Sequence, residues 1–224
     1  TLLLHNNGHE VVLWSIIKDE VEMLKTKRQH ETKLPGVVLP GDIQITDDLK
    51  EAMDSKDVLV LAVPSPFTRS TSRMMREYLK KGQIVVNVAK GIEEHTLYTL
   101  TDIMEEEMPG VDAAVLSGPS HAEEVGKGLP TTCVAGAHSR ETAEYLQNIF
   151  MSPTFRVYTS PDMLGIELGG SLKNVIALAA GTADGLGYGD NTKAALITRG
   201  IAEIARLGIK MGGKAETFYG LTGI

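Results

Sequence analysis

The residue whose setting points most directly to chemistry is Lys173. It lies beside Asn174 inside Gly165–Gly181, a stretch rich in Leu, Ile and Ala, without proline, that is predicted to be a helix. The stretch is apolar almost all the way round, which is typical of a helix buried in a core. A lysine there either extends its ammonium group to water or has a task that offsets its desolvation, and both interpretations stay open. One turn earlier, Gly169 and Gly170 leave room for a ligand or another backbone.

A second cation, Lys90, directly follows a predicted strand. Three near-continuous apolar strands are expected at 57–63, 83–89 and 113–116, a pattern that favours a parallel sheet covered on both faces. Ligands of such sheets bind outside the carboxyl ends of the strands. Small, polar, turn-forming segments follow all three strands, at 63–65, 89–91 and 117–120. Together they predict a ligand site at one edge of the sheet, to which Lys90 adds positive charge.

The order of the predicted elements indicates two domains. Further strands are expected at 9–14, 42–46, 131–135 and 155–158, and shorter helices at 47–55, 68–81, 96–107 and 139–150. After Ser160 only long helices follow, at about 162–186 and 190–211. The pattern predicts an α/β fold, with a doubly wound, Rossmann-type, mostly parallel sheet followed by an all-α domain, to which the resemblance described below gives the role of substrate domain. We place the dinucleotide-binding domain at 1–159 and the helical substrate domain at 160–224.

Composition narrows the possible partners. The 224 residues carry a net charge of −7, which argues against nucleic acid as the main partner, because a phosphate backbone needs a basic face. A single cysteine, Cys133, excludes an internal disulfide and fits a reducing, cytoplasmic compartment. No apolar run is expected to reach membrane-spanning length, so no membrane partner is expected. The six histidines are scattered without ligand spacing, so no metal site is expected.

The two ends of the sequence suggest the middle of a longer protein. The chain does not begin with methionine, and its first residues resemble the tail of a helix that stops at Gly8. The Gly-rich dinucleotide fingerprint is absent and is expected before Thr1. After the strand that ends at Trp14, no carboxylate occurs before Asp19, which favours NADP over NAD as the cofactor.

Several segments, taken together, resemble one family. They are N-G-H-E-V-V-L-W, L-A-V-P-S, A-K-G-I-E, S-G-P-S-H-A-E-E-V, S-L-K-N-V-I-A and N-T-K-A-A-L-I-T-R-G. The resemblance covers nearly all of the chain and is to the bacterial-type NAD(P)-dependent glycerol-3-phosphate dehydrogenases. It implies an oxidoreductase that interconverts dihydroxyacetone phosphate and sn-glycerol 3-phosphate by hydride transfer with NADP or NAD, supplying phospholipid synthesis. It also implies a cytoplasmic homodimer whose partner is a small triose or glycerol phosphate.

The resemblance assigns roles to individual residues. It implies that Lys173 is catalytic, and that the substrate is bound by Lys90, Gly118, Ser120 and Asn174. It implies that the cofactor is bound by Trp14, Ser15, Lys90 and Ala122. The sequence departs from the family pattern at Ile16, where arginine or histidine is frequent, and at His121, where phenylalanine is common. The family's phosphate-binding segment, S-R-N-R-R, is expected beyond Ile224.

The implied chemistry accounts for the two lysines. Hydride reduction of a ketone leaves negative charge on the carbonyl oxygen, so a proton donor must stand beside it. Burial and the charge of Lys90 are expected to lower the pKa of Lys173 toward the working pH. Two alternatives stay open. One is a related two-domain dehydrogenase of hydroxy acids, which needs a carboxylate clamp, and the other is a non-catalytic nucleotide-binding module, against which Lys90 and Lys173 argue.

Overall fold

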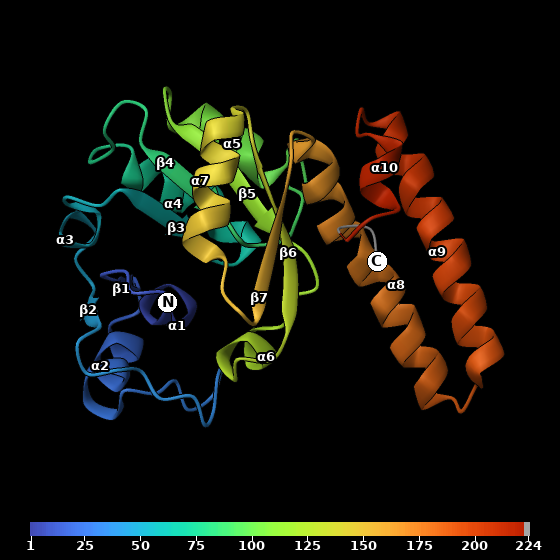
Figure 1. The fold of residues 1–224 in the computed structure, drawn as a ribbon, viewed down its shortest axis with the longest axis horizontal. Helices are drawn as coiled ribbons and strands as arrows, with labels where there is room; N and C mark the ends of the chain where they lie inside the picture. Colours follow the sequence, from blue (N-terminus) through green and yellow to red (C-terminus); the bar gives the residue numbers. More distant parts are fainter. Residues whose placement is uncertain (222–224) are drawn as a thin grey trace.

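Strands and helices alternate up to Ser160, and only helices follow (Figure 1). The computed structural model describes residues 1–221, so the end of the expected helical domain at 222–224 lies outside the described residues. The strands are β1 (Val12–Trp14), β2 (Gln44–Thr46), β3 (Val58–Leu61), β4 (Ile84–Asn87), β5 (Asp112–Ser117), β6 (Thr131–Ala137) and β7 (Phe155–Ser160). The helices are α1 (Leu2–Asn6), α2 (Lys18–Lys27), α3 (Leu49–Met53), α4 (Thr68–Met75), α5 (Leu100–Glu107), α6 (Ala122–Gly126), α7 (Arg140–Phe150), α8 (Met163–Gly185), α9 (Asp190–Lys210) and α10 (Ala215–Phe218), and a short 3₁₀ helix, η1, covers Ser65–Phe67.

Five strands form the main sheet in the order β3-β4-β5-β6-β7. Every neighbouring pair is parallel except β5 and β6, which run antiparallel with Ser117 opposite Val134. The segment 118–130, which contains α6, therefore returns along the same edge of the sheet and makes no crossover. As a result the beginning of β6 lies beside the carboxyl end of β5.

Two helical layers cover this sheet because neighbouring residues of a strand face opposite sides. Val85 and Ala113 pack with α4 and α5, while Val86 and Ala114 pack with α7 and, at the margin, with α1. Each layer has its own buried cluster. The doubly wound, mostly parallel arrangement expected from the sequence is confirmed.

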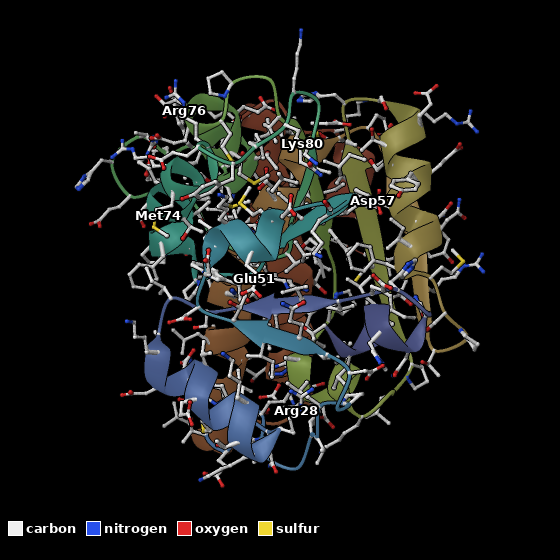
Figure 2. All side chains as sticks on the ribbon, turned by 90° about the vertical axis from the view of Figure 1, so that its left-hand side faces the viewer. Arg28, Glu51, Asp57, Met74, Arg76 and Lys80 are labelled. Carbon is white, nitrogen blue, oxygen red and sulfur yellow. The ribbon has the colours of Figure 1, made fainter. Side chains whose placement is uncertain are left out.

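The first strands form a separate small unit. Strands β1 and β2 pair in parallel in a two-stranded sheet, where α2 buries Val21 and Leu24 against β2 and the segment before it. In Figure 2 this sheet lies between the labelled Arg28, after α2, and Asp57, before β3. A hollow of about 500 Å³ lies at its edge and is lined by residues that include Val12 and Lys56. The single sheet expected from the sequence is thus two sheets in the described part of the chain.

Helices α8 and α9 form a long hairpin beside the sheet, with α10 against it (Figure 1). The first half of α8 packs on the sheet, where Met163 and Ile166 meet Val115 of β5 and Val134 of β6. A further cluster joins α8, α9 and α10 through the buried side chains of Leu168, Ile204, Ala205 and Phe218. The helix that carries Lys173 is therefore anchored to the sheet at its amino end.

The second half of α8 corrects two expectations. Val175 and Leu178 are 65% and 73% exposed, so the prediction of a helix buried all the way round is wrong beyond its first half. Among the described residues α9 packs along this half on one side, and other apolar side chains face outward. By length and composition alone α8 could also cross a membrane, so the expectation that no apolar run reaches that length is wrong.

Candidate functional site

The two lysines singled out in the sequence lie at one place in the fold. Lys90 lies in the segment after β4, and its side chain reaches α8, because a Cβ added to Gly170 would lie 3.8 Å from Lys90 Cγ. The same Cβ would lie 2.5 Å from Ser117 Oγ at the end of β5. Gly170 thus leaves room for two side chains, and the expected approach of a ligand or another backbone stays a prediction. Lys173 follows Gly170 by three residues on the same helix, and its ammonium group is near enough to Lys90 for the two charges to interact.

Burial weakens both lysines as bases. Loss of solvent lowers the pKa of Lys173, and the nearby charge of Lys90 lowers it further. Loss of solvent likewise lowers the pKa of Lys90. The lowering expected for Lys173 from the sequence is confirmed in direction and in both causes. A lysine adjusted in this way exchanges its proton more readily near neutral pH than a lysine in water.

The segment after β5 supplies a hydroxyl to the same place. The ammonium nitrogen of Lys90 lies 3.5 Å from Ser120 Oγ, which in turn donates a hydrogen bond to the carbonyl oxygen of Gly118 at 3.3 Å. Gly118 has φ +153°, and a Cβ there would lie 2.7 Å from the carbonyl oxygen of Thr132 on β6. Only glycine lets this turn pass so close to the neighbouring strand. The structure thus brings Lys90, Gly118 and Ser120 together.

Cys133 lies next to the group formed by Lys90, Gly118 and Ser120, although it was not assigned to the site from the sequence. The buried thiol is near enough to Lys90 and Lys173 for their charges to act on its pKa, although burial raises that pKa overall. A Cβ on Gly118 would come within 3.3 Å of its sulfur. The antiparallel return of β6 places it here, which periodicity could not predict. The sequence interpretation of a buried thiol inside a strand is confirmed.

Ser171 joins the two lysine-bearing segments, and sequence reasoning missed it. Its Oγ accepts a hydrogen bond from the backbone N–H of Gly91 at 2.9 Å and donates one to the carbonyl oxygen of Glu167 at 2.8 Å. Gly91 is the residue after Lys90, and Ser171 lies two residues before Lys173. A hydroxyl within an apolar helix, so close to its lysine, was the available signal.

Glu167 is a second residue that sequence reasoning missed. Its side chain is buried, and Oε1 accepts the backbone N–H of Thr101 at 3.1 Å while Oε2 accepts the hydroxyl of Thr101. It therefore caps the first turn of α5 from α8. Burial raises its pKa to about 7. The signal in the sequence was a carboxylate in the same apolar stretch as Lys173.

The remaining candidate residues lie outside this group. Asn174 is exposed on α8, and Ala122 is exposed at the start of α6. Trp14 and Ser15 lie at the end of β1 in the two-stranded sheet, apart from the lysines. The indole N–H of Trp14 donates to the carbonyl oxygen of Asp47 at 3.2 Å. These four positions keep the roles that the sequence assigned as predictions.

The end of β1 offers both a carboxylate and an ammonium group. The hydroxyl of Ser15 donates to Glu20 at 3.0 Å and accepts the backbone N–H of Ile17 at 3.2 Å. The same carboxylate forms an ion pair with Lys33. An acidic group suits a ribose diol and a cation suits a 2′-phosphate, so these residues fit the adenosine end of either NAD or NADP. Among residues 1–221 no group of three or more His, Cys, Asp or Glu is arranged to hold a metal ion.

Comparison with known proteins agrees with this arrangement. The sequence profile for the N-terminus of NAD-dependent glycerol-3-phosphate dehydrogenase matches residues 1–143, and the profile for its C-terminus matches residues 162–224. The chain is similar to the glycerol-3-phosphate dehydrogenases [NAD(P)+] of Fusobacterium nucleatum and Agathobacter rectalis, at 66% identity each over 100% of the chain. It spans 67% of the length of each of these relatives.

A solved structure has the same fold. The crystal structure of glycerol-3-phosphate dehydrogenase from Coxiella burnetii aligns with a TM-score of 0.94 at 34% identity. The alignment covers 99% of this chain and 68% of that one. The agreement includes both the sheet and the helices after Ser160, so the two-part architecture is shared as a whole.

Proposed function

This chain belongs to the NAD-dependent glycerol-3-phosphate dehydrogenase family, and from that premise we propose that it interconverts dihydroxyacetone phosphate and sn-glycerol 3-phosphate. It is an enzyme, and its cofactor is NADP or NAD. The observation that carries the proposal is the placement of Lys90 and Lys173 together, at an edge where two strands end, with the pKa of each lowered. Such a pair suits a phosphorylated ketone better than a neutral one, because the ligand brings negative charge to two cations.

Lys173 is the proposed proton donor. When bound, the nicotinamide supplies or accepts the hydride at the substrate carbon. Protonated Lys173 donates its proton to the carbonyl oxygen as charge develops there, and neutral Lys173 takes the hydroxyl proton in the reverse direction. Partial burial supports both roles, since it brings the charged and neutral forms closer in free energy.

The other residues bind and orient the ligands in this proposal. Lys90 and Ser120, whose Nζ and Oγ atoms lie 3.5 Å apart, hold the substrate. The backbone of Gly118 lies beneath the substrate, and Asn174 forms a hydrogen bond with a substrate hydroxyl group. Lys90 also faces the cofactor, whose remaining contacts are assigned to Trp14, Ser15 and Ala122. The contacts of Ser15 with Glu20 support an adenosine site at the end of β1. We retain the proposed division into a dinucleotide-binding domain at 1–159 and a substrate domain from 160.

The proposed setting follows the same premise. The product, sn-glycerol 3-phosphate, would supply phospholipid synthesis, and the protein would act in the cytoplasm as a homodimer. The net charge of −7 supports a small-molecule partner over nucleic acid. The packing of the amino half of α8 on β5 and β6 supports its role as a core helix and not as a membrane span.

A substrate panel tests the proposal. The protein, expressed from its complete gene, is assayed for oxidation of NADPH and of NADH with dihydroxyacetone phosphate, with unphosphorylated dihydroxyacetone and with an unphosphorylated 2-keto acid. We expect saturable turnover with dihydroxyacetone phosphate and little with the other two. Faster turnover of the keto acid would favour a hydroxy-acid dehydrogenase, and no turnover with any of them would favour a non-catalytic module.

A further inference from the structure

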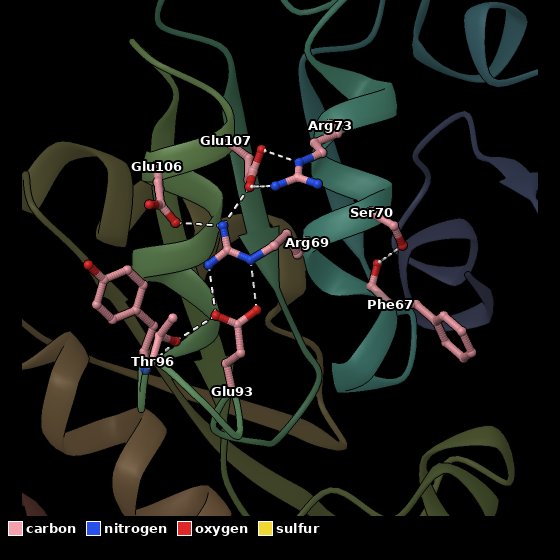
Figure 3. Close-up of polar contacts among 9 residues, drawn as sticks. Phe67, Arg69, Ser70, Arg73, Glu93, Thr96, Glu106 and Glu107 are labelled. Carbon is pink, nitrogen blue, oxygen red and sulfur yellow. Dashed lines mark hydrogen bonds and ion pairs between the residues drawn. The ribbon is translucent and has the colours of Figure 1, made fainter.

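The segment between β4 and α5 carries Lys90 and has little regular structure of its own. At its start, the side chain of Asn87 bonds both the N–H and the carbonyl oxygen of Ala89, at 3.1 and 3.0 Å. The N–H of Gly91 is held by Ser171. Two residues farther on, the side chain of Glu93 leaves this segment toward α4 (Figure 3). The position of Lys90 therefore depends on what holds the segment at each of these points.

Arg69 of α4 holds Glu93 with a two-pronged ion pair. Its Nε and Nη2 donate to the two carboxylate oxygens of Glu93, each at 2.7 Å. The third guanidinium nitrogen donates to both Glu106 and Glu107 at the end of α5 (Figure 3). Paired donors on a planar guanidinium fix the orientation of a carboxylate, which a lysine ammonium cannot do.

The 3₁₀ turn that precedes this helix meets the segment at a second point. A Cβ on Gly91, which has φ +159°, would lie 2.4 Å from the Cβ of Ser65 in the 3₁₀ turn that leads into α4. The segment thus packs against Ser65 at Gly91, the residue after Lys90. It pairs with Arg69 at Glu93, three residues after Lys90. Both contacts come from one continuous stretch of chain, so a shift of either would move the backbone of Lys90.

Arg73 shows what distinguishes Arg69. It lies one turn along α4 and also forms a two-pronged pair, with Glu107 at 2.8 and 2.9 Å. Its side chain is 65% exposed and its partner lies on α5, whereas the side chains of Arg69 and Glu93 are only 22% and 23% exposed. Of the two arginines, Arg69 is the one that binds the Lys90 segment.

We propose that Arg69 and Glu93 are positioning residues that set the place of the Lys90 ammonium group and thereby the affinity for the phosphorylated substrate. The inference rests on the proposed function, because it takes Lys90 as a substrate ligand. Bonding to Arg69 lowers the pKa of Glu93 to about 2, so the pair stays ionised throughout the neutral range. Neither side chain is assigned a contact with substrate or cofactor, and both act through the segment that they hold.

The test compares Arg69→Lys with Arg73→Lys in the enzyme expressed from its complete gene. Both substitutions keep the charge and lose the two-pronged geometry, but only the first touches the Lys90 segment. We expect Arg69→Lys to raise the KM for dihydroxyacetone phosphate about tenfold, the order expected when one charge-assisted contact is weakened. The Kd for NADPH, measured by fluorescence titration, should change by less than about threefold, and Arg73→Lys should leave both within about twofold.

Two further variants separate positioning from general stability. Glu93→Gln should reproduce the rise in KM, and it supplies the test if Arg69→Lys does not fold. In a Lys90→Ala background, Arg69→Lys should add almost nothing to the KM, because the group that it positions is gone. Full additivity of the two changes, or equal KM values for Arg69→Lys and Arg73→Lys, would overturn the proposal. Turnover by the wild type is measured first, so failure of the proposed function itself is recognised separately.

Discussion

Replacing Glu167 with glutamine should make the protein more stable above neutral pH. Glu167 is 5% exposed, and burial raises its pKa from 4.5 to about 7. The folded protein therefore binds this proton more tightly than the unfolded chain does. Between about pH 4.5 and pH 7 the folded state keeps a proton that the unfolded state releases, so the free energy of unfolding falls as the pH rises.

The size of this effect follows from the two pKa values. A shift from 4.5 to about 7 corresponds to roughly 3 kcal/mol, fully present as stability below the unfolded pKa and lost once the pH passes the folded one. Glutamine carries no charge at any pH. Its oxygen can accept the N–H of Thr101, and its amide can donate to the hydroxyl oxygen of Thr101, which reverses the wild-type bond in which that hydroxyl donates to Oε2.

The assay is urea unfolding followed by far-UV circular dichroism, for wild type and Glu167→Gln, at steps from about pH 4.5 to pH 8. The variant minus wild-type difference in the free energy of unfolding should grow by about 3 kcal/mol across this range and then level off. Glu203→Gln is the control, because Glu203 pairs with Arg206 on α9 and has its pKa lowered, so its pH-dependent change falls mainly below pH 4.5 and its difference should stay nearly constant across this range. A difference for Glu167→Gln that does not change with pH would refute the reasoning.

Two other predictions concern the site itself. Lys90→Ala should weaken substrate binding more than cofactor binding, because the ammonium group is placed against Ser120. Titration of each ligand separately measures the two affinities. Equal, small losses of both would mean that Lys90 has no specific role in binding the substrate. Gly118→Ala should destabilise the fold by about 1–3 kcal/mol, since its Cβ would lie 2.7 Å from the carbonyl oxygen of Thr132. Thermal unfolding measures this loss of stability, with Gly181→Ala as the control. Gly181 lies in α8, and a Cβ added there would have nothing within 4 Å, so this substitution should stabilise the protein by about 0.5–1 kcal/mol. A Gly118→Ala protein as stable as wild type would contradict the clash.

Local pattern predicted the long elements of this fold well. Helices α8 and α9 begin and end within one residue of the ranges expected from periodicity, because long apolar periods have few competing interpretations. Helix α4 ends at Met75, earlier than the expected 81, since the following residues form turns. The short α6 escapes prediction because five residues carry too little periodic signal.

Some residues of the site could not be predicted from the sequence, because their neighbours come from distant segments of the chain. The antiparallel β6 brings Cys133 to the lysines, and no local feature of that strand distinguishes it from a parallel one. Lys173 was found because a charge in an apolar helix is conspicuous. Glu167 lies in the same stretch, but its partner Thr101 is 66 residues away in the chain, so its capping of α5 could be recognised only in the fold.

One variant tests most directly the proposal that Lys173 donates the proton in ketone reduction. Lys173→Ala, in the enzyme expressed from its complete gene, is compared with wild type for turnover of dihydroxyacetone phosphate and, separately, for NADPH affinity. Loss of a general acid should reduce kcat by roughly 10²- to 10⁴-fold while cofactor binding stays nearly unchanged. Turnover within a few-fold of wild type would contradict the account and make Lys173 a structural residue of α8.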